Sequence, residues 1–208
     1  MSDPISSALV KGGVKAGATA AHGLLQKLLG PAAEEFGFML RDKARVYRLK
    51  NFISVVAKTE ELLRAASIDA HAVPLRTMLP IMDGASLEDD KGLVRKWAGL
   101  LASAAAAMEP WATHPSFPRI LSEITPHEAI MLDRLLEAGG EAVWPPLRKQ
   151  LAKDFSCPED SINSAHWNLF RLGLWVNIEA QAPSQPVLRL TEFGRLFLAV
   201  THGPQNVP

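Results

Sequence analysis

Residues 158–200 read PEDSINSAHWNLFRLGLWVNIEAQAPSQPVLRLTEFGRLFLAV, and this stretch decides the fold. Pro158 suits the start of a helix, and Gly173 suits its end. The next residues alternate as a strand does, with one set at Leu174, Val176 and Ile178 and the other at Trp175, Asn177 and Glu179. A loop leads to a second strand at 187–190, and Thr191 caps a last helix. The stretch therefore predicts a helix, a β-hairpin and a final helix.

Two further helices precede this stretch. Thr125-Pro126-His127-Glu128 has the pattern of a capping box with proline at the first helical position, and Gly139-Gly140 ends that helix. Pro145-Pro146 opens the next helix. The order helix, helix, turn, helix, hairpin, helix predicts a winged-helix-like module with an added C-terminal helix at 125–203. The alternative is that these elements belong to one undivided helical domain.

Residues 31–124 predict a helical body. Apolar spacing indicates a long helix at 32–67, and Pro74 opens a short helix whose length Pro80 limits. Ser86-Leu-Glu-Asp89 resembles a capping box, so we expect it to start the next helix. That helix carries an apolar stripe at Leu93, Trp97, Leu100, Leu101, Ala104 and Met108.

The N-terminal segment is expected to form a helix that packs on the core or docks on a partner, and the C-terminal tail is expected to be mobile. Segment 1–30 contains an amphipathic pattern at 5–29, but four internal glycines weaken that helix unless a surface supports it. The tail at 204–208 is expected to be mobile. The fold class is thus mainly α, a helical domain with long helices followed by a C-terminal winged-helix-like module with a small β-hairpin.

Charge and composition point to no special partner or compartment beyond the cytoplasm. The formal net charge is zero, from 22 basic and 22 acidic side chains, so no global field attracts nucleic acid or an anionic membrane. Cys157 is the only cysteine, which fits a reducing compartment. No signal peptide and no apolar run of about 20 residues are evident. We expect a cytoplasmic protein, with peripheral membrane association through 5–29 as an alternative.

The sequence lacks the motifs that usually carry catalysis. The six histidines show no metal-ligand spacing, and neither a glycine-rich phosphate loop nor a serine nucleophile elbow is present. We therefore expect no catalytic, cofactor-binding or metal-binding residues and no cofactor. The expectation is a protein that is not an enzyme.

A winged helix suggests DNA binding, but the charges argue against it. The helix at 158–172 begins with Glu159 and Asp160 and offers only Arg171 as a cation, while the loop at 180–186 is uncharged. The start of such a helix normally faces the groove, where two acids would repel phosphate. We therefore expect the module to pack against protein and do not expect nucleic acid as a partner.

Candidate partner-binding residues lie in two places. Arg41, Arg45 and Arg48 share one face of the long helix. They would form an anion or nucleic-acid contact strip, or, as we favour, a solvated surface that pairs with local acids. Trp167 lies on the helix at 158–172, and the strand alternation places Trp175 outward. Exposed together, these tryptophans would form an adhesive patch, and the alternative is that a neighbouring helix covers them.

Three central runs resemble a known family. They are PAAEEFGFMLRDKARVYRLKNF at 31–52, VPLRTMLPIMDGASLEDDKGLVRKWAGLLASAA at 73–105 and HPSFPRILSEITPHEAIMLDRL at 114–135. Read in this order, they resemble the Abi-alpha family, a bacterial family named for abortive infection. The resemblance implies a role in defence against phage, beside partner proteins. It implies no reaction and no cofactor, and it supplies no catalytic residues.

The preferred hypothesis is a non-enzymatic defence component that acts through protein–protein contact or self-association. One alternative is a membrane-perturbing effector that inserts residues 5–29. Another is a DNA-binding regulator that uses residues 126–202. An enzyme of unrecognised type has no support in the sequence.

Overall fold

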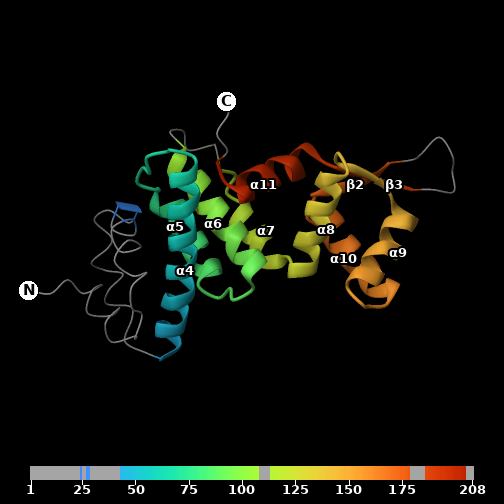
Figure 1. The fold of residues 1–208 in the computed structure, drawn as a ribbon, viewed down its shortest axis with the longest axis horizontal. Coiled ribbons are helices and arrows are strands. Elements are labelled where there is room, and N and C mark those ends of the chain that lie inside the picture. Colours follow the sequence, from blue (N-terminus) through green and yellow to red (C-terminus); the bar gives the residue numbers. More distant parts are fainter. Residues whose placement is uncertain (1–23, 25–26, 29–42, 108–112, 179–185, 205–208) are drawn as a thin grey trace, which may run out of the picture. The chain divides into compact units, whose positions relative to one another are not determined.

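The computed structural model describes residues 24, 27–28, 43–107, 113–178 and 186–204 of the chain (Figure 1). These residues form eight helices and one three-stranded antiparallel sheet, which confirms the prediction of a mainly helical fold. They divide into unit 1, Met1–Ser122 with Val200–Pro208, and unit 2, Glu123–Ala199. The predicted helix at 5–29 lies outside the described residues except for residues 24, 27 and 28, as does most of the tail.

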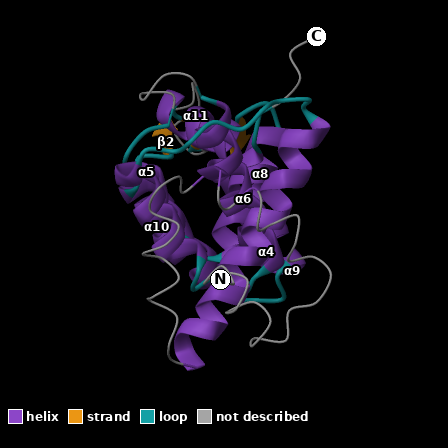
Figure 2. Cartoon of the chain, turned by 90° about the vertical axis from the view of Figure 1, so that its left-hand side faces the viewer, coloured by secondary structure: helices purple, strands orange, loops and turns teal. Residues whose placement is uncertain are grey.

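Unit 1 is built on the helices α4 (Lys43–Ala65), α5 (Leu75–Ala85), α6 (Lys91–Ala106) and α7 (Phe117–Glu123). Two hydrogen bonds show that α4 and α6 run side by side in the same direction. The Tyr47 hydroxyl donates to Asp89 Oδ2 over 3.3 Å beside the start of α6, and the Thr59 hydroxyl donates to the Ala98 carbonyl over 3.2 Å. Helix α5 makes the return connection that two parallel neighbours require, and Figure 2 shows α4 and α6 next to each other.

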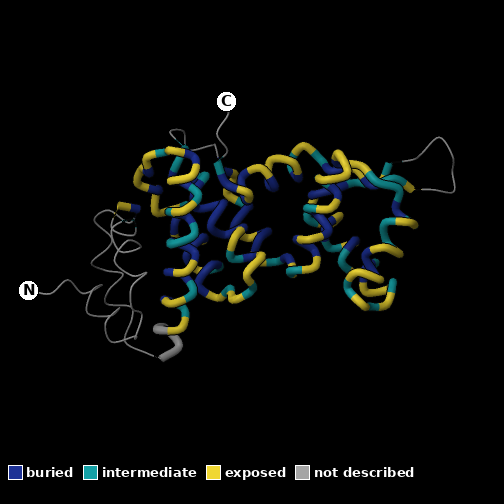
Figure 3. Tube along the Cα trace, in the orientation of Figure 1, coloured by how far each residue is buried: buried dark blue, intermediate teal, exposed yellow. Residues whose placement is uncertain are grey.

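The core of unit 1 forms where α4, α5 and α6 turn their apolar faces toward one another. Five members of the predicted α6 stripe are buried, namely Leu93, Trp97, Leu100, Leu101 and Ala104. Phe52, Val55 and Val56 of α4 and Met78 and Ile81 of α5 are fully buried as well. Buried and exposed positions alternate along each helix, as Figure 3 shows, which is the expected result of a 3.6-residue repeat.

Two glycines of unit 1 allow backbone and side chains to approach closely. A Cβ on Gly99 would lie 2.0 Å from the Thr201 carbonyl oxygen, and one on Gly84 would lie 2.3 Å from the Trp97 ring. The neighbouring Ser103 hydroxyl donates to the Val200 carbonyl over 2.9 Å. The chain around Val200 and Thr201 therefore packs directly on the backbone of α6.

The prediction that Pro80 limits its helix was wrong. Helix α5 continues through Pro80 to Ala85. Proline lacks the amide that would bond to the carbonyl of Arg76, four residues earlier. Both residues lie on the exposed side of α5, where water can satisfy that carbonyl. The loss of one hydrogen bond on a solvated face is therefore insufficient to end the helix.

The predicted capping box at Ser86 was also wrong. Asp90 caps α6, because its Oδ1 accepts hydrogen bonds from the amides of Gly92 (2.8 Å) and Leu93 (3.0 Å). Ser86 instead follows the end of α5, where its hydroxyl donates to the Asp83 carbonyl over 2.9 Å. A serine used at the end of one helix is not available to start the next.

Unit 2 places a small sheet among helices. Its elements are α8 (Pro126–Glu137), β1 (Glu141–Val143), α9 (Trp144–Asp154), α10 (Glu159–Arg171), β2 (Trp175–Ile178), β3 (Val187–Leu190) and the start of α11 (Glu192–His202). The strand order is β1-β3-β2, and both pairings are antiparallel. The pairing of β2 with β3 confirms the predicted hairpin. The interpretation of this unit as a winged helix stays a prediction.

Local signals in unit 2 act as the sequence indicated. The Thr125 hydroxyl accepts from the Glu128 amide, and the Glu128 carboxylate accepts from the Thr125 amide, which completes the capping box. Gly173 has a φ of 72° and follows α10. The Thr191 hydroxyl accepts from the Gly194 amide over 2.8 Å and caps α11. No sequence pattern predicted β1, which is only three residues long.

We expect Gly99→Ala to lower the free energy of unfolding by about 1–3 kcal/mol, because the added methyl group meets backbone that cannot rotate away. The measurement is urea unfolding followed by circular dichroism. Gly92→Ala is the control in the same helix, since its Cβ would meet only the Asp90 carboxylate oxygen at 3.1 Å. Equal losses in the two variants would contradict the close packing described for Gly99.

Candidate functional site

Of the three arginines in the predicted strip, the structure describes the side chain of Arg48. Arg41 lies outside the described residues, and Arg45 belongs to α4 but has no described side chain. The Arg48 guanidinium forms an ion pair with Asp83 at 3.1 Å and donates from Nε to the Ser86 hydroxyl over 2.8 Å. Arg48 therefore joins α4 to the end of α5. Its charge is used inside unit 1, as the favoured alternative of pairing with local acids predicts.

The expectation that Trp175 points outward was wrong, because its side chain is fully buried. Its indole N–H donates to the His166 carbonyl over 3.2 Å. Leu174 precedes β2, and its carbonyl accepts from the Thr191 amide. The strand alternation therefore begins at Trp175, which pairs with the buried Leu190, and the assumed phase was shifted by one residue.

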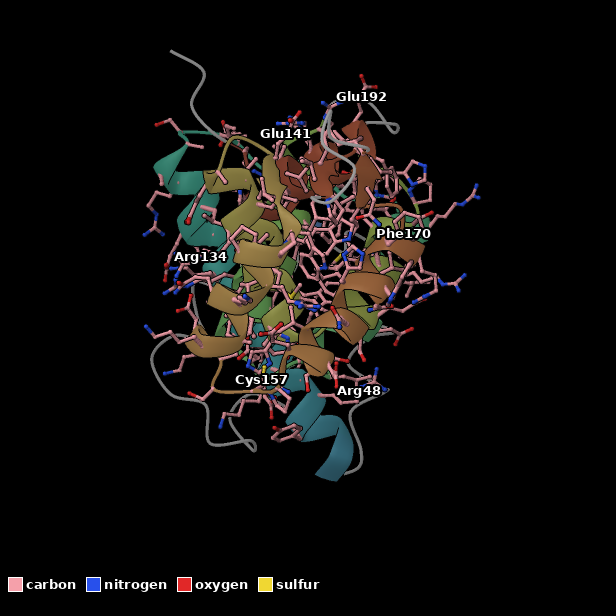
Figure 4. All side chains as sticks on the ribbon, turned by 90° about the vertical axis from the view of Figure 1, so that its right-hand side faces the viewer. Arg48, Arg134, Glu141, Cys157, Phe170 and Glu192 are labelled. Carbon is pink, nitrogen blue, oxygen red and sulfur yellow. The ribbon has the colours of Figure 1, made fainter. Side chains whose placement is uncertain are left out.

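Trp167 is exposed, and its neighbour on the helix surface is Phe170. The side chains keep 60% and 40% of their surface accessible, and their ring centroids lie 5.7 Å apart at an interplanar angle of 85°. We call these two residues the aromatic pair. Phe170 is labelled in Figure 4, on α10. The pair gives the outer face of α10 an apolar centre.

His166 lies beneath the aromatic pair in a cluster of rings. Its imidazole centroid is 4.5 Å from that of Trp144, 5.5 Å from Trp175 and 5.3 Å from Trp167. Only 4% of the residue is exposed, and Nδ1 has no hydrogen-bond partner among the described residues. Burial lowers the pKa of His166 below its ordinary value of 6.5, so the ring is neutral at pH 7. The aromatic pair therefore rests on an uncharged, closely packed base.

Sequence reasoning identified Trp167 but missed Phe170 and His166 as parts of this site. The helical repeat of α10 could have revealed both residues, because the buried positions of this helix are Ile162, His166 and Leu169. That spacing leaves Trp167 and Phe170 on the outer part of the helix, three residues apart. The contact of His166 with Trp144 could not be read from spacing, because Trp144 comes from α9.

The cations next to α10 are paired with acids. Arg148 of α9 lies 2.7 Å from Glu159, and Arg171 lies 2.8 Å from Glu123. Asp160 is exposed and forms no ion pair among the described residues. The outer face of α10 thus combines an apolar centre with an acidic start and a basic end. Such a face suits protein contact better than contact with phosphate.

The described part of the chain contains neither a candidate metal-binding cluster nor a candidate membrane-spanning helix. No group of three or more histidine, cysteine, aspartate or glutamate side chains is placed to hold a metal ion among these residues. Likewise, none of the described helices is long and apolar enough to cross a bilayer.

Comparison with known proteins gives one match. The family model described as abortive infection alpha matches residues 44–201. The match covers all the helices and strands described above except the first residue of α4 and the last of α11. No curated protein and no solved structure matches the chain.

Alanine substitutions at the two tryptophans should differ in their effect on stability. Trp175→Ala should lower the free energy of unfolding by about 3–5 kcal/mol, because it empties a buried site. Trp167→Ala should change it by no more than about 0.5 kcal/mol, since the side chain is mainly exposed. Urea unfolding of both variants measures the difference. Similar losses would show that the assignment of inner and outer positions is wrong.

The neutral His166 predicts a dependence of stability on pH. The unfolded chain binds a proton at this residue near pH 6.5, whereas the folded chain binds it only at lower pH. Stability should therefore fall as the pH drops below about 6.5 and continue to fall until the folded pKa is reached.

His166→Phe keeps a ring but removes the titrating group. From pH 7.5 to pH 5.5, about one unit above and below the ordinary histidine pKa, this variant should therefore lose less stability than the wild type does. The urea midpoint at each pH is the measurement. His71→Gln, which removes an exposed histidine of unit 1, is the control. A loss in His166→Phe as large as that of the wild type would contradict the prediction.

Proposed function

The chain belongs to the abortive infection alpha family, and we propose that it is a non-enzymatic, cytoplasmic component of antiphage defence that acts through protein–protein contact. Family membership supports the role in abortive infection. The mode of action is our inference from unit 2. The exposed aromatic pair on α10 carries this inference.

Two properties make the aromatic pair a suitable contact surface. Tryptophan and other large rings contribute much of the binding energy of protein interfaces, because they bury a large area at a low entropic cost. Trp167 and Phe170 also fix each other through an edge-to-face contact, and His166 lies against both rings. The pair is thus held in place before a partner binds, which lowers the cost of ordering it.

We propose a second copy of this chain as the occupant of the face. Its formal net charge is zero, so two copies do not repel each other at long range. A two-fold axis would place two α10 helices antiparallel, with Trp167 near the middle of the contact. Asp160 of each copy would then lie near Arg171 of the other, which also pairs with Glu123 of its own copy, so opposite charges approach each other at both ends.

The other modes of action have less support. A DNA-binding regulator would need an excess of cations around α10, but Arg148 of α9 and Arg171 of α10 each pair with an acid, and Asp160 adds a further negative charge. A membrane-perturbing effector would depend on residues 5–29, and this alternative stays a prediction from the sequence alone.

Replacement of both residues of the aromatic pair tests the proposal. The double variant Trp167→Ala, Phe170→Ala should weaken self-association by about ten-fold or more, because the centre of the interface is lost. Analytical ultracentrifugation of the full chain measures this change. Cells that express the variant should lose protection in a phage plaque assay.

The control is Ile130→Ala, which removes another exposed apolar side chain of unit 2, on α8. This variant should associate and protect as the wild type does. A wild-type chain that stays monomeric would overturn the choice of a second copy as the occupant. Full protection by the double variant would overturn the role of α10 altogether.

A further inference from the structure

Unit 1 carries a groove that the proposed contact through α10 does not use. It lies between α4 and the start of α6 and has a volume of about 580 Å³, within the usual range of small-molecule sites, roughly 300–1,000 Å³. One face of α4 forms its long side, because Tyr47, Asn51, Ser54, Lys58 and Glu61 recur at intervals of three or four residues. Its lining includes both acids and cations.

Each acid of the groove has a partner within unit 1. Glu61 forms an ion pair with Lys58, three residues earlier on α4. Glu88 accepts hydrogen bonds from the amides of Asp89 and Asp90, at 3.1 Å and 2.9 Å. The Asp89 carboxylate accepts from the Tyr47 hydroxyl. Hydrogen bonds from neutral donors therefore hold the carboxylates of Glu88 and Asp89 in place, while only Glu61 is paired with a cation.

Three of its four cations have no such partner. Lys50, Lys91 and Arg95 are exposed, and they form neither an ion pair nor a side-chain hydrogen bond with the described residues. Lys58 is the exception, through its pair with Glu61. With four cations and three carboxylates, the groove has a formal charge of +1, and its unpaired cations come from two helices.

The two cations on α6 occupy positions that helix electrostatics disfavours. Lys91 is the first residue of α6, where the helix dipole is positive and favours acids. Arg95 follows four residues later, so the two like charges face each other along the helix. Glu88, Asp89 and Asp90 precede Lys91 and act against the first repulsion, and a bound anion would relieve both repulsions further.

Tyr47 adds an aromatic surface beside these cations. Its side chain is 53% exposed, and the bond from its hydroxyl to Asp89 fixes the direction of the ring. A fixed, exposed ring is a platform on which a planar base can stack. A simple phosphate ion would make no use of this ring and would fill only a small part of the groove.

We propose that the groove binds a nucleotide, whose base stacks on Tyr47 and whose phosphates contact Lys50, Lys91 and Arg95. Asp90 already occupies the first amides of α6, so the side chains hold the phosphates. A nucleic-acid strand is disfavoured, because three cations in a chain of zero net charge give little of the phosphate neutralisation that such binding requires.

Titration calorimetry with the full chain tests this proposal, with ADP, pyrophosphate and adenosine as separate probes. ADP should bind, and its affinity should fall with added salt because the contacts are ionic. The double variant Lys91→Ala, Arg95→Ala should lose affinity for ADP by about ten-fold or more. Tyr47→Leu should weaken ADP and leave pyrophosphate unchanged, whereas Tyr47→Phe should retain ADP.

Arg76→Ala is the matched control, since it removes an exposed cation of unit 1 that lies on α5 and outside the groove. It should bind ADP as the wild type does. Circular dichroism checks the folding of each variant, and Lys50→Gln provides a second charge change if the double variant unfolds.

Three outcomes would overturn the proposal. The first is a wild-type chain that does not bind ADP, and the second is ADP binding that neither Lys91→Ala, Arg95→Ala nor Lys50→Gln weakens. The third is binding of a single-stranded oligonucleotide in preference to ADP. None of these outcomes bears on the aromatic pair of α10, so this proposal and the proposed function fail independently.

Discussion

The contact of His166 with Trp144 and Trp175 is the constraint on which the arrangement of unit 2 depends. These three residues come from α10, α9 and β2, so one cluster of rings joins two helices to the sheet. The indole of Trp175 can be buried because the His166 carbonyl accepts its N–H. With His166 turned inward, the period of the helix turns Trp167 outward and leaves Phe170 partly exposed. The packing of His166 inside unit 2 thereby determines which residues of α10 are exposed.

The sequence predicted best where a local signal controls the backbone. The capping box of Thr125 and Glu128, the cap at Thr191 and the glycine after α10 each act within a few residues, so neighbours along the chain suffice to reveal them. The strand at 187–190 has the predicted bounds for the same reason. Trp167 was named as a candidate because tryptophan is frequent at protein interfaces, and whether it is exposed was left open.

The sequence failed where distant residues decide. β1 has three residues and exists through its pairing with β3, where Glu141 lies opposite Arg189. Ser86 resembles a helix cap, but bonds to Asp83 and Arg48 engage its hydroxyl elsewhere. The orientation of Trp175 depended on where β2 starts, because a shift of one residue exchanges the two faces of a strand. Each of these outcomes depends on contacts that spacing does not encode.

Residues that the fold itself explains are weak candidates for function, and this criterion separates the candidates here. Arg48 stabilises the junction of α4 and α5, and Trp175 fills the interior of unit 2, so the structure accounts for both. The aromatic pair exposes apolar area to water, and Lys91 opposes the dipole of its own helix. Apolar contact would cover the first of these, and a bound anion would offset the second, so the partners that we propose for the two sites differ in chemistry.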